Sequence, residues 1–166
     1  MHNVDLLARE TLARGKRLSF HNHVGTFVET AEELDHLAAL TDERVVGLCL
    51  DVGHYTLAGG DPTAALRTFG SRIDHVHLKD VSSQVRQGMR DGSIDGFIAG
   101  LRARVFTELG GGVLDLEGVL RLLAARGYGG WLMVEQDTTW RSPAESAAIS
   151  HAALQQTLLL LANEAG

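Results

Sequence analysis

Four short segments of the chain are predicted to be β-strands, and in all four one face changes from apolar to polar along the strand. They span residues 17–23, 45–51, 73–80 and 130–137. Side chains alternate between the two faces of a strand, so each segment can be sorted into two sets. One face is apolar throughout, as with Leu18 and Phe20, whereas the other becomes polar toward the carboxyl end. The pattern predicts four strands that each end in titratable side chains.

Helical segments separate these strands. Their start signals are Thr30 with Glu33 as a capping box, Asp61 with Pro62, Asp115, and Ser142 with Pro143. Gly127 provides a stop for the helix that follows Asp115. Between the third and fourth strands, we expect residues 81–114 to hold a short helix around 94–104 and loops. Alternating strands and helices predict an α/β fold with a parallel sheet, in a single domain over residues 1–166.

Composition restricts the function classes. The net charge is −6 and the basic residues are scattered, which argues against a nucleic-acid-binding surface. No apolar run reaches the ~20 residues of a membrane span, and residues 1–17 lack the features of a signal peptide. The single cysteine, Cys49, fits a reducing compartment. We therefore expect a soluble, cytoplasmic protein that acts on a small molecule, without nucleic-acid or membrane partners.

The polar strand ends predict a shared site. Parallel strands have their carboxyl ends on one side of the sheet, where α/β proteins build their sites. The side chains that would converge there are His21, His23, Asp51, His75, His77 and Glu135. Mixed imidazole and carboxylate ligands suit Mn, Co, Fe or Zn better than Ca or Mg. An ion-pair network is the alternative interpretation of Asp51, His77 and Glu135.

Several other residues allow both a functional and a structural interpretation, or only a structural one. Lys79 and Asp80 form either a substrate-binding cation with its supporting acceptor or a surface pair. Trp140 either walls a sugar pocket or serves packing. We expect Cys49 to be buried and inert, and the glycines at 110–112 to form a turn, because no Lys-Ser/Thr follows as in a phosphate loop. His36 and His151 fall on helices and are expected at the surface.

Five segments carry a family resemblance. They are "FHNHVGT", "LCLDVGHYTLAGGDP", "RIDHVHLKD", "FTELGGGVLDLEGVL" and "YGGWLMVEQD". In this order, across almost the whole chain, they resemble the xylose isomerase-like TIM-barrel superfamily of sugar isomerases, epimerases and endonuclease IV. Within that superfamily, the pattern is most similar to the inosose dehydratases (2-keto-myo-inositol dehydratases).

The resemblance implies roles for individual residues. Asp51, His77 and Glu135 would be metal ligands from three successive strands, and His21 occupies the position where the epimerases have a glutamate ligand. Whether His21, His23 or a water completes the set is open. His54 would line the substrate site, and the substrate-binding set would be His23, His75, Lys79 and Trp140. Mn or Co is the expected metal, with Zn, Fe or Mg as alternatives.

The implied activity is that of a metal-dependent lyase of inositol catabolism. It would dehydrate an inosose, a cyclic polyol ketone, through an enediolate. His21, His54 or Glu135 would remove the α-proton, and Lys79 would stabilise negative charge. The alternatives are a sugar isomerase or epimerase, which returns the proton, and an inactive truncated fragment of such an enzyme. DNA-repair chemistry is disfavoured by the acidic charge and by too few His and Asp ligands for a multinuclear zinc site.

The length departs from the family. A complete (β/α)₈ barrel takes about 250 residues, whereas this chain has 166 and resembles the second half of the family. We therefore expect about half a barrel, with four parallel strands and their helices. Either the chain is truncated, or a homodimer completes the barrel and covers the sheet edges and the inner face that would otherwise stay open.

Overall fold

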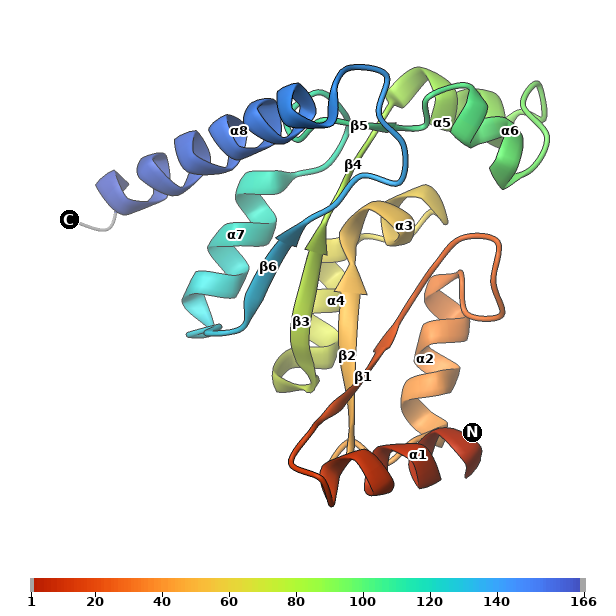
Figure 1. The fold of residues 1–166 in the computed structure, drawn as a ribbon, viewed down its shortest axis with the longest axis vertical. Coiled ribbons are helices and arrows are strands. Elements are labelled where there is room, and N and C mark those ends of the chain that lie inside the picture. Colours follow the sequence, from red (N-terminus) through yellow and green to blue (C-terminus); the bar gives the residue numbers. More distant parts are fainter. Residues whose placement is uncertain (1, 165–166) are drawn as a thin grey trace.

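A four-stranded parallel sheet forms the centre of the protein in the computed structural model, which describes residues 2–164 (Figure 1). The strands are β1 (Leu18–His21), β2 (Val46–Asp51), β3 (Ile73–Leu78) and β6 (Trp131–Val134), in the spatial order β1-β2-β3-β6. All three pairings are parallel. The four predicted strands are confirmed, although most end earlier than expected. Polar residues such as Lys79 and Glu135 follow directly after the last strand residue.

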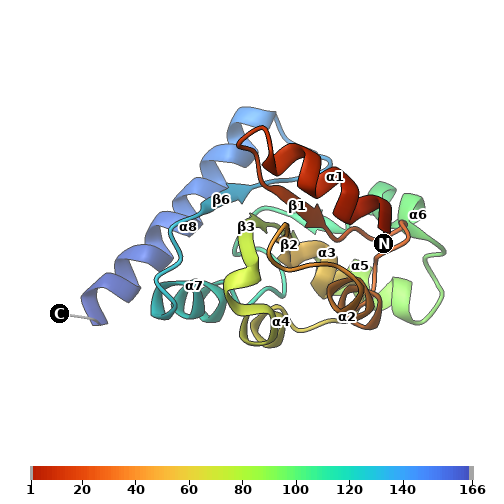
Figure 2. The same cartoon turned by 90° about the horizontal axis from the view of Figure 1, so that it is seen from below.

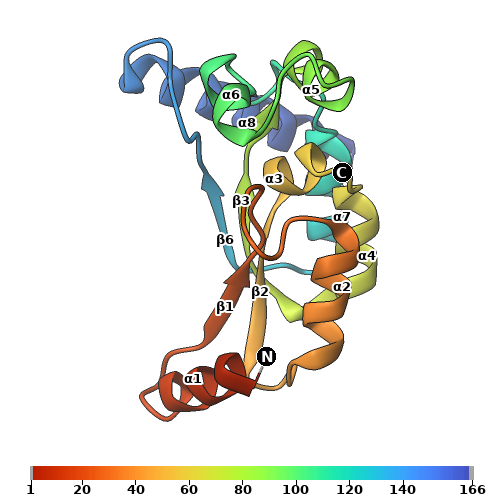
Figure 3. The same cartoon turned by 90° about the vertical axis from the view of Figure 1, so that its right-hand side faces the viewer.

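Three helices cover one face of the sheet (Figures 2 and 3). These are α2 (Ala31–Leu40), α4 (Pro62–Phe69) and α7 (Leu116–Ala125), and their predicted caps are present. Thr30 and Glu33 make the reciprocal bonds of a capping box, while Asp61 and Asp115 each accept a backbone N–H. The apolar face of each strand packs against these helices, so that Leu48, Leu50, Val76 and Leu78 are almost fully buried.

Two long helices lie at the ends of the chain. Helix α1 (His2–Leu12), which the sequence analysis did not predict, lies below the amino-terminal ends of β1 and β2 (Figure 1). The predicted last helix is α8 (Pro143–Glu164), which packs against α7. Within residues 2–164, no helix has the length and apolar character needed to cross a membrane.

The segment between the third and fourth strands contains more structure than predicted. It has two helices, α5 (Ser83–Arg90) and α6 (Phe97–Arg102), and a small antiparallel sheet of β4 (Asp80–Val81) and β5 (Phe106–Thr107). These elements enclose a second apolar cluster that includes Val85 and Phe106. Strands of two residues show no alternation, which is why the sequence pattern missed them. The short turn η1 (Gly70–Arg72) precedes β3.

The other face of the sheet has no helix over it among the described residues (Figure 3). Trp131 and Met133 of β6 point to this face and are 75% and 45% exposed. Strands β1 and β6 each pair on one side only. The expected half-barrel is therefore confirmed: four parallel strands with their helices, and no closed barrel within residues 2–164.

Candidate active site

Four predicted ligands converge at the carboxyl ends of the strands. His21, Asp51, His77 and Glu135 each place one ligand atom within 4.8 Å of those of the other three. The strand register explains the convergence, because Asp51 lies opposite His77, and His21 lies opposite Cys49, two residues before Asp51. Glu135 follows β6 directly. Three adjacent strands and the start of one loop thus build the group.

Asp51 is at the centre of this group and is fully buried. Its Oδ1 accepts a hydrogen bond of 2.7 Å from the backbone N–H of His54 and caps helix α3 (Val52–Leu57). Its Oδ2 lies 3.5 Å from Nε2 of His21 and 3.7 Å from Nδ1 of His77. Burial opposes ionisation of Asp51, but the adjacent His21 ring and the Lys79 ammonium hold its pKa below the usual value.

Two atoms that face each other in this group lack hydrogen-bond partners. Among the described residues, Nε2 of His21 and Oδ2 of Asp51 are both buried and have no hydrogen-bond partner, although the Lys79 ammonium forms an ion pair with Oδ2 at 3.3 Å. Buried polar atoms are rarely left unpaired in folded proteins. A cation held between an imidazole nitrogen and a carboxylate oxygen would satisfy both atoms. The donor set therefore fits the divalent metal that the sequence predicts.

His77 and Glu135 differ in their exposure to solvent. Nδ1 of His77 lies 2.7 Å from Oε2 of Glu135. Burial lowers the pKa of His77 despite the nearby Glu135 charge, so the imidazole is neutral at neutral pH and available as a ligand. The Glu135 side chain is 41% exposed, whereas that of Asp51 is fully buried. Glu135 is therefore the carboxylate of the group that a bound molecule can reach.

Lys79 lies inside the protein, with only 1% of its side chain exposed. Its ammonium donates to Asp137 and lies 3.3 Å from both Asp51 Oδ2 and Glu135 Oε2. Burial opposes the charge, but the carboxylates of Asp51 and Asp137 raise the pKa of Lys79. The alternative of a surface pair with Asp80 is wrong, because both residues are buried.

Asp137 is a site residue that the sequence analysis did not single out. It lies two residues after Glu135, so alternation places both on the same face. Its side chain is 17% exposed and contacts Lys79 and His54. Burial acts against ionisation, yet hydrogen bonds from His54 and Lys79 lower the pKa of Asp137. Alternation identified the face, but only the fold shows which partners lie opposite.

His54 and His23 form a second cluster with Asp137. The backbone N–H of Val24 donates to Nδ1 of His54 at 3.3 Å, while Nε2 lies 3.1 Å from the Lys79 ammonium and 3.4 Å from Asp137 Oδ2. Burial lowers the pKa of His54, which favours the neutral ring. The His23 ring stacks on His54 with 3.6 Å between centroids. The structure thus groups His21 with the predicted ligands and His23 with His54.

Asp80 fixes the loop beside the site. Its fully buried carboxylate accepts hydrogen bonds from the backbone N–H groups of Gly110, Gly112 and Leu114 at 2.9–3.0 Å. A side chain at Gly112 would start 2.3 Å from Asp80 Oδ1. The glycine run is therefore a turn, as predicted, and it wraps around Asp80.

The remaining predicted residues lie outside both clusters. His75 is half-buried on the open face, and its ring centroid is 5.4 Å from that of His77. Trp140 is 48% exposed and packs against the Arg104 guanidinium. Cys49 is buried as expected, and burial raises its pKa to about 12. His36 and His151 are exposed on helices, as expected.

Comparison with known proteins agrees with this architecture. The fold and the strand-end site define an α/β protein with half the strands of a (β/α)₈ barrel. The sequence matches the family described as xylose isomerase-like TIM barrel over residues 1–157, and the chain belongs to this family.

Curated relatives narrow the class. An inosose dehydratase of Clostridium botulinum (strain Eklund 17B / Type B) is 37% identical over 148 residues, which cover 88% of this chain and 49% of that protein. The rhizopine catabolism protein MocC of Rhizobium meliloti is 42% identical over 147 residues, 87% of this chain and 45% of the relative. The chain thus spans about half the length of the curated relatives it matches.

Solved structures show the same fold. A D-tagatose 3-epimerase-like protein superposes with a TM-score of 0.70 at 19% identity, over 98% of this chain and 54% of the other. The probable 3-DHS dehydratase AsbF from Bacillus anthracis gives 0.69 at 16% identity, over 93% and 53%. At these identities the likeness supports the fold alone.

Proposed function

We propose that the protein is a divalent-metal-dependent lyase that removes water from an inosose. The observation that carries the proposal is the convergence of His21, Asp51, His77 and Glu135, in which Nε2 of His21 and Oδ2 of Asp51 lie 3.5 Å apart and lack hydrogen-bond partners among the described residues. The relatives named inosose dehydratase support the substrate class, a cyclic polyol ketone. The proposed reaction takes the α-proton from carbon and expels a hydroxide from the adjacent carbon.

His21, Asp51, His77 and Glu135 would hold the metal. Two imidazoles with two carboxylates favour Mn or Co, and Zn, Fe or Mg are alternatives. When bound, a divalent ion polarises a substrate carbonyl and stabilises the negative charge of an enediolate. Lys79 holds Asp51 and Glu135 in place, because its ammonium lies 3.3 Å from each carboxylate.

Glu135 is the proposed base for the α-proton. Its contacts with His77 and Lys79 both involve Oε2, so we assign Oε1 to take the proton. His21 is the other candidate in an arrangement where it is not a metal ligand, since its side chain is 28% exposed. His54 is less suited, because it is fully buried and both of its ring nitrogens have partners. We assign His54 to positioning Asp137 and, through it, Lys79.

Two substrate-binding predictions gain support from position. His23 covers His54 at the edge of the site, and His75 lies on the open face below His77. Trp140 would reach a substrate only from the outer rim, next to Arg104. A sugar isomerase or epimerase shares the same ligands and is the alternative function, since it differs only in returning the proton to carbon.

We further propose that two copies of the chain complete the barrel. Strands β1 and β6 are open edges of one parallel sheet, so that β6 of each copy can pair with β1 of the other. Two four-stranded halves give the eight strands of a closed (β/α)₈ barrel. The pairing would cover Trp131 and Met133, which a soluble protein otherwise exposes at a cost.

Product analysis tests the activity. The purified chain, loaded with Mn²⁺ or Co²⁺, is incubated with scyllo-inosose and with candidate ketoses. Loss of water from the inosose, abolished by Glu135→Gln and unaffected by Glu117→Gln on the exposed side of α7, supports the lyase. Epimer formation without loss of water would favour the isomerase class. No turnover of either substrate by a metal-loaded dimer would contradict both.

A further inference from the structure

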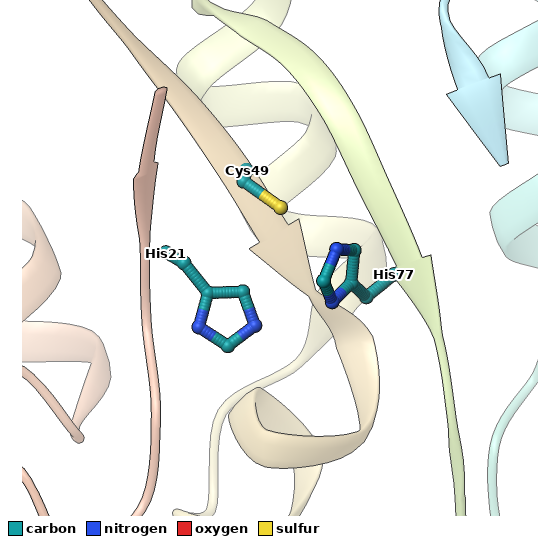
Figure 4. Close-up of side chains that lie close together, drawn as sticks. All are labelled: His21, Cys49 and His77. Carbon is teal, nitrogen blue, oxygen red and sulfur yellow. The ribbon is translucent and has the colours of Figure 1, made fainter. Parts of the chain in front are cut away.

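A softer donor lies directly beneath the four proposed ligands. Cys49 precedes Asp51 by two residues in β2, so both side chains point to the open face of the sheet. In the register, Cys49 lies opposite His21 of β1. Figure 4 shows the Cys49 sulfur directed toward the space between the imidazoles of His21 and His77.

The three side chains satisfy the distance requirement of a metal site. One ligand atom each from His21, Cys49 and His77 lies within 4.8 Å of the other two. His21 and His77 also belong to the four-ligand group with Asp51, whose side chain is fully buried. The buried Nε2 of His21 has no hydrogen-bond partner among the described residues, so it is available to an ion beside the sulfur.

We propose that His21, Cys49 and His77 form a second metal-binding set, which takes a thiophilic ion such as Cd²⁺, Cu⁺ or Zn²⁺. Thiolate and imidazole together favour soft and borderline ions, whereas Mn²⁺ prefers the carboxylates of Asp51 and Glu135. Binding replaces the thiol proton by the metal and releases that proton to solvent. No oxidant or reductant is needed.

The two sets cannot be filled at once. Both use His21 and His77, so an ion bound to Cys49 takes two imidazoles from the carboxylate set. A thiophilic ion would therefore displace a harder ion one for one. The bound ion would then lie two residues further from the carboxyl ends of the strands, away from Glu135. The inference goes beyond the proposed reaction, because it concerns which ion occupies the centre and does not require turnover.

Titration of the chelator-treated chain with Cd²⁺ and with Mn²⁺ tests the inference. Calorimetry gives the stoichiometry, and ultraviolet absorption detects a thiolate-to-cadmium charge-transfer band. We expect one Cd²⁺ per chain with that band, and one-for-one displacement of bound Mn²⁺. In Cys49→Ser the band should vanish and the Cd²⁺ affinity should fall by at least about tenfold, while the Mn²⁺ affinity stays within about twofold.

The outcomes separate this inference from the proposed function. Cd²⁺ binding without the band, equal Cd²⁺ affinity in Cys49→Ser, or no Cd²⁺ binding would overturn the second set, even if Mn²⁺ binds. A Cys49-dependent Cd²⁺ site without Mn²⁺ binding would support the second set and contradict the four-ligand centre. Cys49→Ala serves as a second variant, and circular dichroism confirms that each variant is folded.

Discussion

The ammonium of Lys79 lies 3.3 Å from Oδ2 of Asp51, although neither side chain is exposed by more than 1%. A buried charge is costly unless a partner of opposite sign is close. Asp137 supplies a second carboxylate on the other side of Lys79. The ion cluster holds Asp51 ionised and in place before a metal binds. The same contacts therefore stabilise the fold and position a metal ligand.

Replacing Lys79 by methionine should therefore destabilise the protein. Lys79→Met keeps the length of the side chain but leaves Asp51 and Asp137 without their shared cation. Breaking a buried pair in this way costs about 3 kcal/mol in the free energy of unfolding, which urea denaturation measures. Lys16→Met, at an exposed position before β1, is the matched control. Equal stability of the two variants would show that the cluster contributes nothing.

The contribution of Asp137 to the free energy of unfolding should decrease as the pH falls. Hydrogen bonds from His54 and Lys79 lower the folded-state pKa of Asp137, against the effect of burial, so it lies below the unfolded value of about 3.9. The stabilisation is therefore present above about pH 4 and is lost as the pH falls through the folded-state pKa. The wild type should exceed Asp137→Asn by ~3 kcal/mol at pH 6, and the difference should narrow toward pH 3. A difference that is constant over pH 3–6 would contradict this assignment.

Gly53 allows the close approach of α3 to the residue after β3. A Cβ atom there would lie 2.5 Å from Cβ of Lys79 and 2.7 Å from its carbonyl oxygen. Gly53→Ala should therefore shift Lys79 and Asp51 apart and cost ~2 kcal/mol of stability by overpacking. At Gly129 nothing lies within 4 Å of the added atom, so Gly129→Ala is the control and should be neutral. Thermal unfolding of both variants compares them, and equal midpoints would mean that α3 adjusts freely.

The open face should control self-association. Trp131 is 75% exposed on the uncovered face, in the edge strand β6. A charge at this position would be buried in the proposed dimer, so Trp131→Glu should weaken association by at least about tenfold. Leu40→Glu, at a 63% exposed position on the opposite, helix-covered side, should leave it unchanged. Sedimentation at several protein concentrations measures the effect. A monomeric wild type would rule out barrel completion by a second copy.

Much of the site follows from local sequence rules. The period of two identified His21, Asp51, His77 and Glu135 as one polar edge, because parallel strands share their direction. The capping residues Thr30, Asp61 and Asp115 identified the helix starts for the same local reason, since each bonds to backbone groups two or three residues away.

Other features depend on contacts between distant segments. The sequence leaves Lys79 as either a substrate-binding cation or half of a surface pair, and its burial results from the packing of Asp137 and Phe106 around it. The role of Asp80 in holding residues 110–114 likewise needs a loop that returns 30 residues later. Local patterns thus predicted the ligands, whereas the charged residues that contact those ligands could be identified only from the folded structure.

Metal content per chain tests the central claim most directly. Elemental analysis of the purified protein is compared with Asp51→Ala and with Asp35→Ala, an exposed position on α2. The account predicts about one Mn or Co per chain in the wild type and in Asp35→Ala, and a loss of that metal in Asp51→Ala. No metal in the wild type after dialysis against Mn²⁺ or Co²⁺, or the same content in Asp51→Ala, would contradict it.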